Sequence, residues 1–276
     1  MGDGTCRPGD FGGYDADYVR RHTPWLRRVI HGYFRAQIHG FEHVPDQPFL
    51  GVGTHNGGIL MPDMLVWVSA YHTSGRKTPL LTLAHDLLFA REHGLSRVLA
   101  KLGGLRAEPH QALSALRSGF AVQVYPGGDY DSSKPFWRRH QVCFAGRMGY
   151  VRLALSAQVP IVPVVSIGAH ETLLMLSDGR RLAQRLGLRR RLRLAALPLQ
   201  ICLPWGLVLG TPPGYLPLPA QITIRVLPPI SLHGTSADQA SDPAVVARMD
   251  AQVRHAMQVA LDDLAAQRVL FWGQRR

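Results

Sequence analysis

The stretch "FLGVGTHNGGILMPD", residues 49–63, joins an apolar run to a loop that is rich in glycine and polar side chains. Residues 49–54 have the composition of a short buried strand, and residues 63–71 have a helical pattern. A strand that leads into a helix is the repeating element of α/β proteins. The stretch therefore predicts an α/β fold and sets His55 and Asn56 at the exit of a strand.

The same alternation continues along the chain. Further strand-like runs are residues 79–84, 121–125, 161–167 and 222–226. Further helix-like segments are residues 88–102, 111–117, 149–157 and 243–267. The pattern predicts a single α/β domain over residues 36–276, with a mixed, mainly parallel sheet flanked by helices. Residues 1–35 are expected to form a tail and an amphipathic helix that is interrupted near Pro24.

Composition limits the possible partners and compartments. The 276 residues include 31 Lys+Arg and 19 Asp+Glu, a formal net charge of +12, and 46% hydrophobic residues, enough for a sizeable core. Such a charge favours an anionic partner: a nucleic acid, an anionic lipid surface or a phosphorylated substrate. The three cysteines form no CxxC pair and the N-terminus lacks the apolar core of a signal peptide, so we expect a reducing compartment.

Much of the positive charge lies in one segment. Residues 180–193, "RRLAQRLGLRRRLR", contain seven arginines and no acid, with leucines interleaved at roughly helical spacing. Residues 194–224 then carry no charged side chain, but six prolines break the run and argue against a membrane-spanning helix. A basic helix beside an uncharged apolar loop is typical of a monotopic membrane anchor.

We therefore expect residues 180–220 to contact membrane lipids at the cytoplasmic face, as in a peripheral or monotopic protein. The side chains expected at the membrane are Arg189, Arg190, Arg191 and Trp205. The alternative is a solvated basic face beside a buried, proline-rich core segment. The arginine run also lacks the interleaved aromatic residues that favour single-stranded nucleic acid, so no nucleic acid partner is expected.

Three more segments carry possible site residues. "VQVYPGGDYDSSKPF", residues 122–136, is a strand that ends in the tight turn Pro126-Gly127-Gly128. "LAKLGGLRAEP", residues 99–109, contains two adjacent glycines and Arg106. "AQVPIVPVVSIGAHE", residues 157–171, is a buried strand preceded by a proline.

In their order, the four segments resemble the motifs of the glycerolipid (lysophospholipid) acyltransferase family, of the 1-acylglycerol-3-phosphate acyltransferase type. The first motif, a histidine and an aspartate after a strand, is matched by His55 and Asp63. The second is matched by Gly103, Gly104 and Arg106, the third by Pro126-Gly127-Gly128, and the fourth by the run "VPIVPV" of residues 159–164. The resemblance covers roughly residues 35–230.

The resemblance implies transfer of an acyl group from acyl-CoA or acyl carrier protein to a lipid alcohol, without a metal or other cofactor. His55 would be the general base, and a carboxylate would fix its tautomer. Asp63 stands eight positions after His55 rather than the family's usual five, so Asp86, beside His85, is a second possible partner. Asn56, Gly57 and Gly58 would bring main-chain atoms close to the substrate.

Two classes of acceptor fit the sequence. Family members that acylate glycerol phosphates carry an arginine after the third motif, where this chain has Tyr130. A neutral partial glyceride is therefore an alternative to a phosphorylated acceptor.

Two other functional classes are alternatives to an acyltransferase. A lipid hydrolase or thioesterase is disfavoured because the chain has no G-x-S-x-G motif. A non-enzymatic basic membrane-binding module would leave the His-Asn-Gly-Gly and Pro-Gly-Gly turns unexplained.

Overall fold

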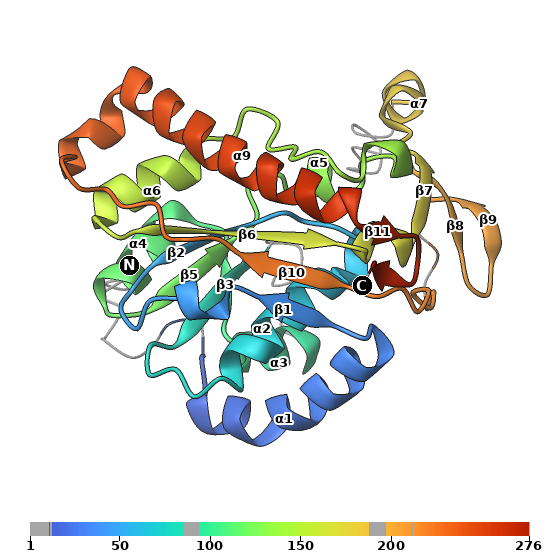
Figure 1. Ribbon diagram of the computed structural model, residues 1–276, viewed down its shortest axis with the longest axis horizontal. Helices are drawn as coiled ribbons and strands as arrows, with labels where there is room; N and C mark the ends of the chain where they lie inside the picture. The colour runs from blue at the N-terminus through green and yellow to red at the C-terminus, as the bar shows by residue number, and fades with distance from the viewer. Residues whose placement is uncertain are drawn as a thin grey trace.

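The computed structural model describes residue 11 and residues 13–84, 94–187, 197–210, 212 and 214–275. Its central feature is a seven-stranded sheet with the order β1-β10-β6-β2-β5-β3-β4 (Figure 1). The strands are β1 Gln37–His39, β2 Leu50–Gly53, β3 Leu80–Ala84, β4 Gly104–Arg106, β5 Ala121–Val124, β6 Ile161–Ile167 and β10 Thr223–Val226. All neighbours pair in parallel except β10 and β6. The expected mixed, mainly parallel sheet is confirmed.

Helices cover both faces of this sheet (Figure 1). They are α1 Ala16–Tyr33, α2 Pro62–His72, α3 Gly94–Lys101, α4 Pro109–Arg117, α5 Asp129–Ser132, α6 Gly149–Ala157, α7 Arg180–Arg185 and α9 Pro243–Ala266. Short 3₁₀ turns are η1 Phe41–His43, η2 Gly58–Leu60, η4 Phe136–Arg138, η5 Ala169–Glu171 and η6 Ala237–Ser241.

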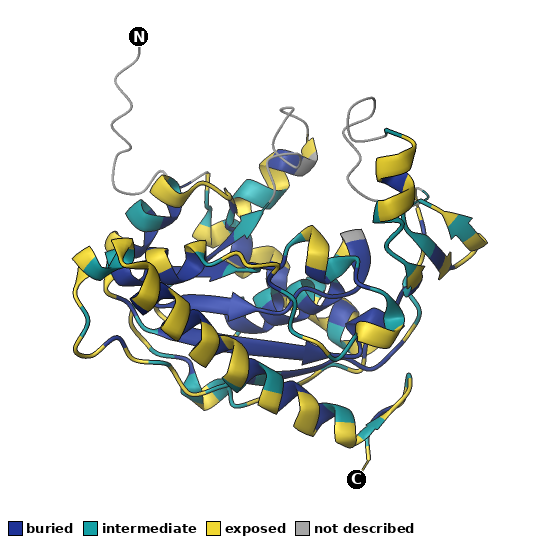
Figure 2. Ribbon diagram, turned by 90° about the horizontal axis from the view of Figure 1, so that it is seen from above, coloured by how far each residue is buried: buried dark blue, intermediate teal, exposed yellow. Residues whose placement is uncertain are grey.

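The sheet separates two hydrophobic cores. Successive side chains of a strand point to opposite faces, so each strand contributes side chains to both cores. Leu50 and Val165 pack with α4, α6 and α9, whereas Phe49 and Val164 pack with α1 and α2. In Figure 2 the buried strands lie enclosed by helices whose outer faces are exposed.

The N-terminal helix differs from its prediction. α1 runs through Pro24 without a break. A proline inside a helix costs about 3 kcal/mol, and burial of Val19, Thr23 and Ile30 on the inner face of α1 offsets that cost. The expected interruption near Pro24 is therefore wrong.

A small antiparallel sheet combines β7 Leu174–Ser177, which precedes α7, with β8 Leu199–Cys202 and β9 Gly206–Leu209 from the apolar segment that follows α7. A two-stranded hairpin of β11 Arg268–Val269 and β12 Gly273–Gln274 follows α9. Within the described residues, no helix combines the length and the apolar character needed to cross a bilayer.

Candidate active site

Three of the sequence motifs meet where adjacent parallel strands end. β6, β2 and β5 are neighbours in the sheet, and all three run in the same direction. Their carboxyl ends lead into the His55 loop from β2, the Pro126 turn from β5 and η5 from β6. Ligand sites of parallel α/β sheets lie at such carboxyl ends. The topology therefore makes this edge of the sheet the candidate active site.

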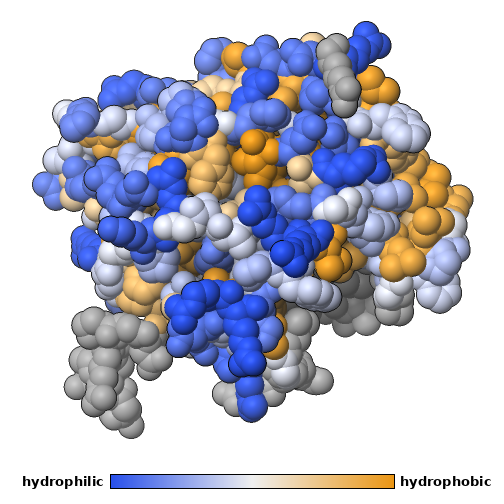
Figure 3. All heavy atoms as spheres, turned by 60° about the horizontal axis from the view of Figure 1, so that its bottom comes forward, coloured by the Kyte–Doolittle hydropathy of each residue, from blue (hydrophilic) through white to orange (hydrophobic). Residues whose placement is uncertain are grey.

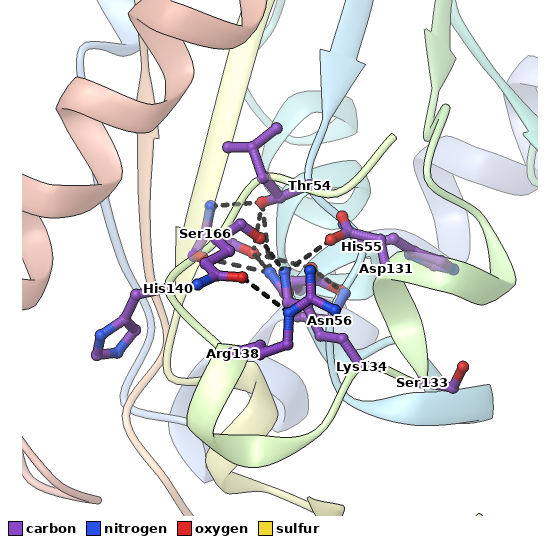
Figure 4. Close-up of polar contacts among 12 residues, drawn as sticks. Thr54, His55, Asn56, Asp131, Ser133, Lys134, Arg138, His140 and Ser166 are labelled. Atoms are coloured by element: carbon purple, nitrogen blue, oxygen red, sulfur yellow. Dashed lines mark hydrogen bonds and ion pairs between the residues drawn. The ribbon is translucent and has the colours of Figure 1, made fainter. Parts of the chain in front are cut away.

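His55 is buried in this loop and is held through its main chain. Its N–H donates a 2.7 Å hydrogen bond to Oδ2 of Asp131 (Figure 4). The imidazole packs against the ring of Tyr125, with 4.8 Å between centroids, and its Nδ1 is buried without a partner among the described residues. Burial, helped by the charge of Lys134, lowers the pKa of His55 to about 4. The ring is therefore neutral at physiological pH, the form in which a nitrogen can accept a proton.

Asp63, in the first turn of α2, is buried behind the same loop. Its Oδ2 accepts hydrogen bonds from the N–H of Asn56 at 3.0 Å and from the hydroxyl of Ser166 at 2.8 Å. Its Oδ1 accepts from the N–H of Met64 at 2.9 Å. Burial raises the pKa of Asp63 to about 7, although these three hydrogen bonds act to lower it.

The polar network extends from Asp63 to the sheet. Ser166 Oγ also accepts a 2.7 Å hydrogen bond from Nδ2 of Asn56, and the Ser166 N–H donates to Oγ1 of Thr54 at 3.0 Å (Figure 4). Within the described residues, no hydrogen bond joins the side chains of His55 and Asp63. Asp63 thus contacts the histidine loop through the N–H of Asn56, the residue after His55. Its role as the carboxylate partner of His55 stays a prediction.

A buried ion pair supports the other side of the loop. Lys134 Nζ lies 2.7 Å from Oδ1 of Asp131, and both side chains are almost fully enclosed. Lys134 also donates to the carbonyl of Gln141 at 2.7 Å. Because Asp131 binds the main chain of His55 with its second oxygen, the ion pair connects the loop after β5 to the loop after β2.

The two glycines after Asn56 occupy conformations that other residues adopt with strain. Gly57 has φ of 86° and Gly58 has φ of 72°. A Cβ on Gly57 would lie 2.8 Å from the carbonyl oxygen of Ala169, and one on Gly58 would lie 2.5 Å from Cδ2 of Leu173. The loop packs so closely on η5 and on the segment leading to β7 that no side chain fits at either position.

Two arginines from later segments of the chain contact the Pro126-Gly127-Gly128 turn and the residue that follows it. Arg147 donates to the carbonyl oxygens of Pro126 and Gly127 at 3.3 and 3.1 Å. Arg147 and Arg180 also pair with Asp129, at 2.8 and 3.4 Å. Burial alone would raise the pKa of Asp129, but the hydrogen bonds and charges of the two arginines hold it below its usual value.

Tyr130 is part of the same group of side chains. The guanidinium carbon of Arg180 lies 3.7 Å from the centroid of the Tyr130 ring, and that of Arg147 lies 5.2 Å from it. The guanidinium groups of Arg147 and Arg180 therefore lie next to Tyr130, the position after the Pro126-Gly127-Gly128 motif where the sequence itself has no arginine.

The remaining predicted residues lie farther from His55 or outside the described residues. Arg106 ends β4, the edge strand, which β3 separates from β5. His85 and Asp86 lie outside the described residues, as do Arg189, Arg190 and Arg191. Trp205 stands in the turn between β8 and β9 and is 54% exposed. In the described part of the chain no group of His, Cys, Asp and Glu has the geometry of a metal site.

Sequence reasoning missed the role of three residues that hold this site: Asp131, Lys134 and Ser166. Ser166 had a visible signal, because it is the only polar residue of β6 and a polar side chain in a buried strand requires a partner. For Asp131 and Lys134 the signal was their i, i+3 spacing on a short turn, which is far weaker.

Comparison with known proteins agrees with this geometry. A family model described as Acyltransferase matches residues 35–167, which include the strand ends that carry His55 and Pro126. The chain belongs to this acyltransferase family, and the resemblance expected from the four motifs is confirmed.

Two kinds of relatives share sequence with the chain. An uncharacterized protein of Mycobacterium tuberculosis is 31% identical over 252 residues, which cover 91% of this chain and 67% of that protein. The "DGAT1/2-independent enzyme synthesizing storage lipids" of Gallus gallus is 27% identical over 172 residues, covering 62% of this chain and 48% of the chicken protein.

One solved structure supports the fold. The crystal structure of the 1-acyl-sn-glycerophosphate (LPA) acyltransferase PlsC from Thermotoga maritima superposes with a TM-score of 0.51 at 16% identity. The match covers 91% of this chain and 78% of that one. At this identity the likeness extends to the fold alone.

Proposed function

We propose that the protein transfers a fatty acyl group from a thioester donor, acyl-CoA or acyl carrier protein, to the hydroxyl of a lipid alcohol. The observation that carries the proposal is the neutral imidazole of His55 at the junction of three strand ends, in a chain of the acyltransferase family. An alcohol is a weak nucleophile until a base removes its proton, whereas a thioester already has a good leaving group.

The proposed reaction needs one base and one stabilised oxyanion. His55 accepts the hydroxyl proton as the alcohol oxygen attacks the thioester carbonyl carbon. The tetrahedral oxyanion then collapses, the carbon–sulfur bond breaks, and the histidine returns the proton to the departing thiolate. Asn56, Gly57 and Gly58 contribute main-chain atoms beside the reacting carbonyl. Asp63 acts through Asn56 and Ser166 by holding the loop in position.

The acceptor is proposed to be a lysophospholipid or another glycerolipid. Arg147 and Arg180 place two guanidinium groups next to Gly128, where Asp129 pairs with both and Asp178 also pairs with Arg180. An anionic headgroup would bind there by taking the place of one of these carboxylates. A neutral partial glyceride is the second candidate, because the chicken relative is named as an enzyme that synthesizes storage lipids.

The protein is proposed to work at a lipid surface as a peripheral or monotopic protein. The outer face of the β8–β9 hairpin is apolar and exposed, and we call it the hairpin face; it consists of Ile201, Leu203, Trp205, Leu207 and Leu209. The alternate residues Gln200 and Cys202 of β8 are buried, so one side of the hairpin serves the core and the other faces outward. Such an apolar patch near basic residues is the composition of a membrane-contacting surface.

The function is tested with labelled acyl-CoA and a panel of lysophospholipids, glycerol phosphates and partial glycerides. We expect free thiol to appear only when a lipid alcohol is present, with one labelled ester formed for each thiol. The acceptor that gives the highest kcat/KM separates the phosphorylated from the neutral class. Equal thiol release without any acceptor would identify a thioesterase and contradict the proposal.

A further inference from the structure

A groove of about 940 Å³ lies between α1 and the turn that joins α2 to β3. It is lined by the end of α2 at His72 and by Thr78 and Pro79, which directly precede β3. β3 runs parallel to β5, whose carboxyl end leads into the Pro126 turn, so the groove lies at the opposite end of the sheet from the His55 loop. It is therefore separate from the candidate active site.

The groove is strongly cationic. Five basic side chains line it, and none of its described lining residues is acidic: Arg20, Arg27, Arg28, Arg76 and Lys77. Asp17 pairs with Arg20 at 2.8 Å and Asp46 pairs with Arg76 at 2.6 Å, both from outside the lining. Arg27 donates to Oγ1 of Thr73 at 3.1 Å. The side chains of Arg28 and Lys77 make no hydrogen bond or ion pair within the described part of the chain.

The wall of the groove is apolar and aromatic. Val19, Pro24 and Tyr71 contribute to it, and the ring of Tyr14 stacks on His72 with 6.5 Å between centroids. Nε2 of His72 is enclosed by protein, so this nitrogen does not face the groove. The groove thus combines five cationic side chains with apolar surface, in a volume that suits a small molecule.

We propose that this groove binds a phosphate monoester that carries an apolar group. A monoester dianion presents two charges and several acceptor oxygens, which match a cluster of guanidinium and ammonium groups. The apolar wall would receive the remainder of the ligand. Figure 3 views the molecule from the α1 side, where hydrophilic side chains predominate and apolar atoms show between them.

Lysine acetylation gives a local readout that is independent of acyl transfer. The chain has three lysines. Lys77 lines the groove, Lys101 is exposed outside the lining with its ammonium 5.1 Å from the centroid of the Tyr18 ring, and Lys134 is buried. We expect phenyl phosphate to protect Lys77 from an N-hydroxysuccinimide ester while leaving Lys101 unprotected, as measured by mass spectrometry. Benzyl alcohol, which has the ring without the phosphate, should give no protection.

Charge reversal on α1 provides the matched variants. The double variant Arg27→Glu/Arg28→Glu should require a phenyl phosphate concentration at least about tenfold higher for half-protection. Arg117→Glu/Arg248→Glu makes the same change in net charge at exposed positions on α4 and α9 and should behave as the wild type. Equal protection in the two double variants would overturn the proposal.

A lipid arm identifies the source of the monoester. Vesicles of phosphatidylcholine with phosphatidic acid present a monoester headgroup, and vesicles with phosphatidylglycerol present a diester. Selective protection of Lys77 by phosphatidic acid supports the proposal and assigns the site to lipid headgroups, whereas protection by phenyl phosphate alone assigns it to soluble ligands. Absence of protection in both arms, or equal protection by phosphatidylglycerol, would overturn it.

Discussion

The N–H of His55 donates a 2.7 Å hydrogen bond to Oδ2 of Asp131, whose other oxygen lies 2.7 Å from Nζ of Lys134. The histidine loop after β2 is thereby fixed by a buried ion pair that belongs to the loop after β5. Because the support acts on the main chain, the imidazole is not engaged by this carboxylate. The arrangement separates the residues that position the loop from the side chain proposed to do the chemistry.

Replacement of His55 by glutamine should lower kcat for acyl transfer by about 10²–10⁴-fold, the usual contribution of a general base. The change should have little effect on folding, since Nδ1 of His55 has no partner to lose among the described residues. Thermal unfolding followed by circular dichroism checks the latter point. His233→Gln, at an exposed position after β10, is the matched control. Wild-type activity in His55→Gln would remove this residue from the mechanism.

The pH dependence of kcat/KM should reflect the lowered pKa of His55. A base acts in its neutral form, and the pKa of His55 near 4 keeps the ring neutral throughout pH 5–7. Activity should therefore persist well below pH 6.5 and decline toward pH 4. Stability should also fall as pH drops below 6.5, because the unfolded chain then binds a proton that the folded ring resists. An acidic limb centred at pH 6.5 in folded enzyme would argue against this buried base.

Breaking the Asp131–Lys134 pair from either side should be costly. Asp131→Asn or Lys134→Met leaves one buried charge without its partner, which typically costs about 3–5 kcal/mol of unfolding free energy. Urea denaturation of the two single variants and the double variant measures this. The double variant should lose clearly less than the sum of the single losses. Additive losses would mean that the two side chains do not interact as a pair.

Ser166→Ala should destabilise the protein by about 1–3 kcal/mol, because the buried Oδ2 of Asp63 and Nδ2 of Asn56 each lose their shortest hydrogen bond. The hydroxyl also lowers the pKa of Asp63, so its removal should raise that pKa above about 7. The folded state of the variant then resists ionisation of Asp63 more strongly. Its stability deficit relative to wild type should consequently be larger at pH 8 than at pH 6. Equal deficits in urea unfolding at the two pH values would contradict the assigned network; Ser114→Ala on α4 is the control.

The sequence was most informative where one periodic signal dominated. β6 and α6 follow their predicted ranges because a run that is apolar except for Ser166 and a clear helical face leave no competing structure. Pro24 was misjudged because local propensity predicts a break, whereas packing of α1 on the domain, which is not visible in the sequence, keeps the helix intact. The hydrogen bond from His55 to Asp131 spans 76 positions and depends on which strands are neighbours, so motif spacing alone did not reveal it.

The hairpin face yields a prediction about lipid binding that does not depend on catalysis. Leu207 and Leu209 are 63% and 56% exposed on β9, and moving a leucine side chain from water into an apolar phase is worth about 1.5–3 kcal/mol. Leu207→Ser/Leu209→Ser should therefore weaken sedimentation with anionic vesicles by at least about tenfold. Val98→Ser/Val259→Ser changes two exposed valines on α3 and α9 and should bind as the wild type does. If both double variants bind vesicles equally well, the hairpin face does not enter the bilayer.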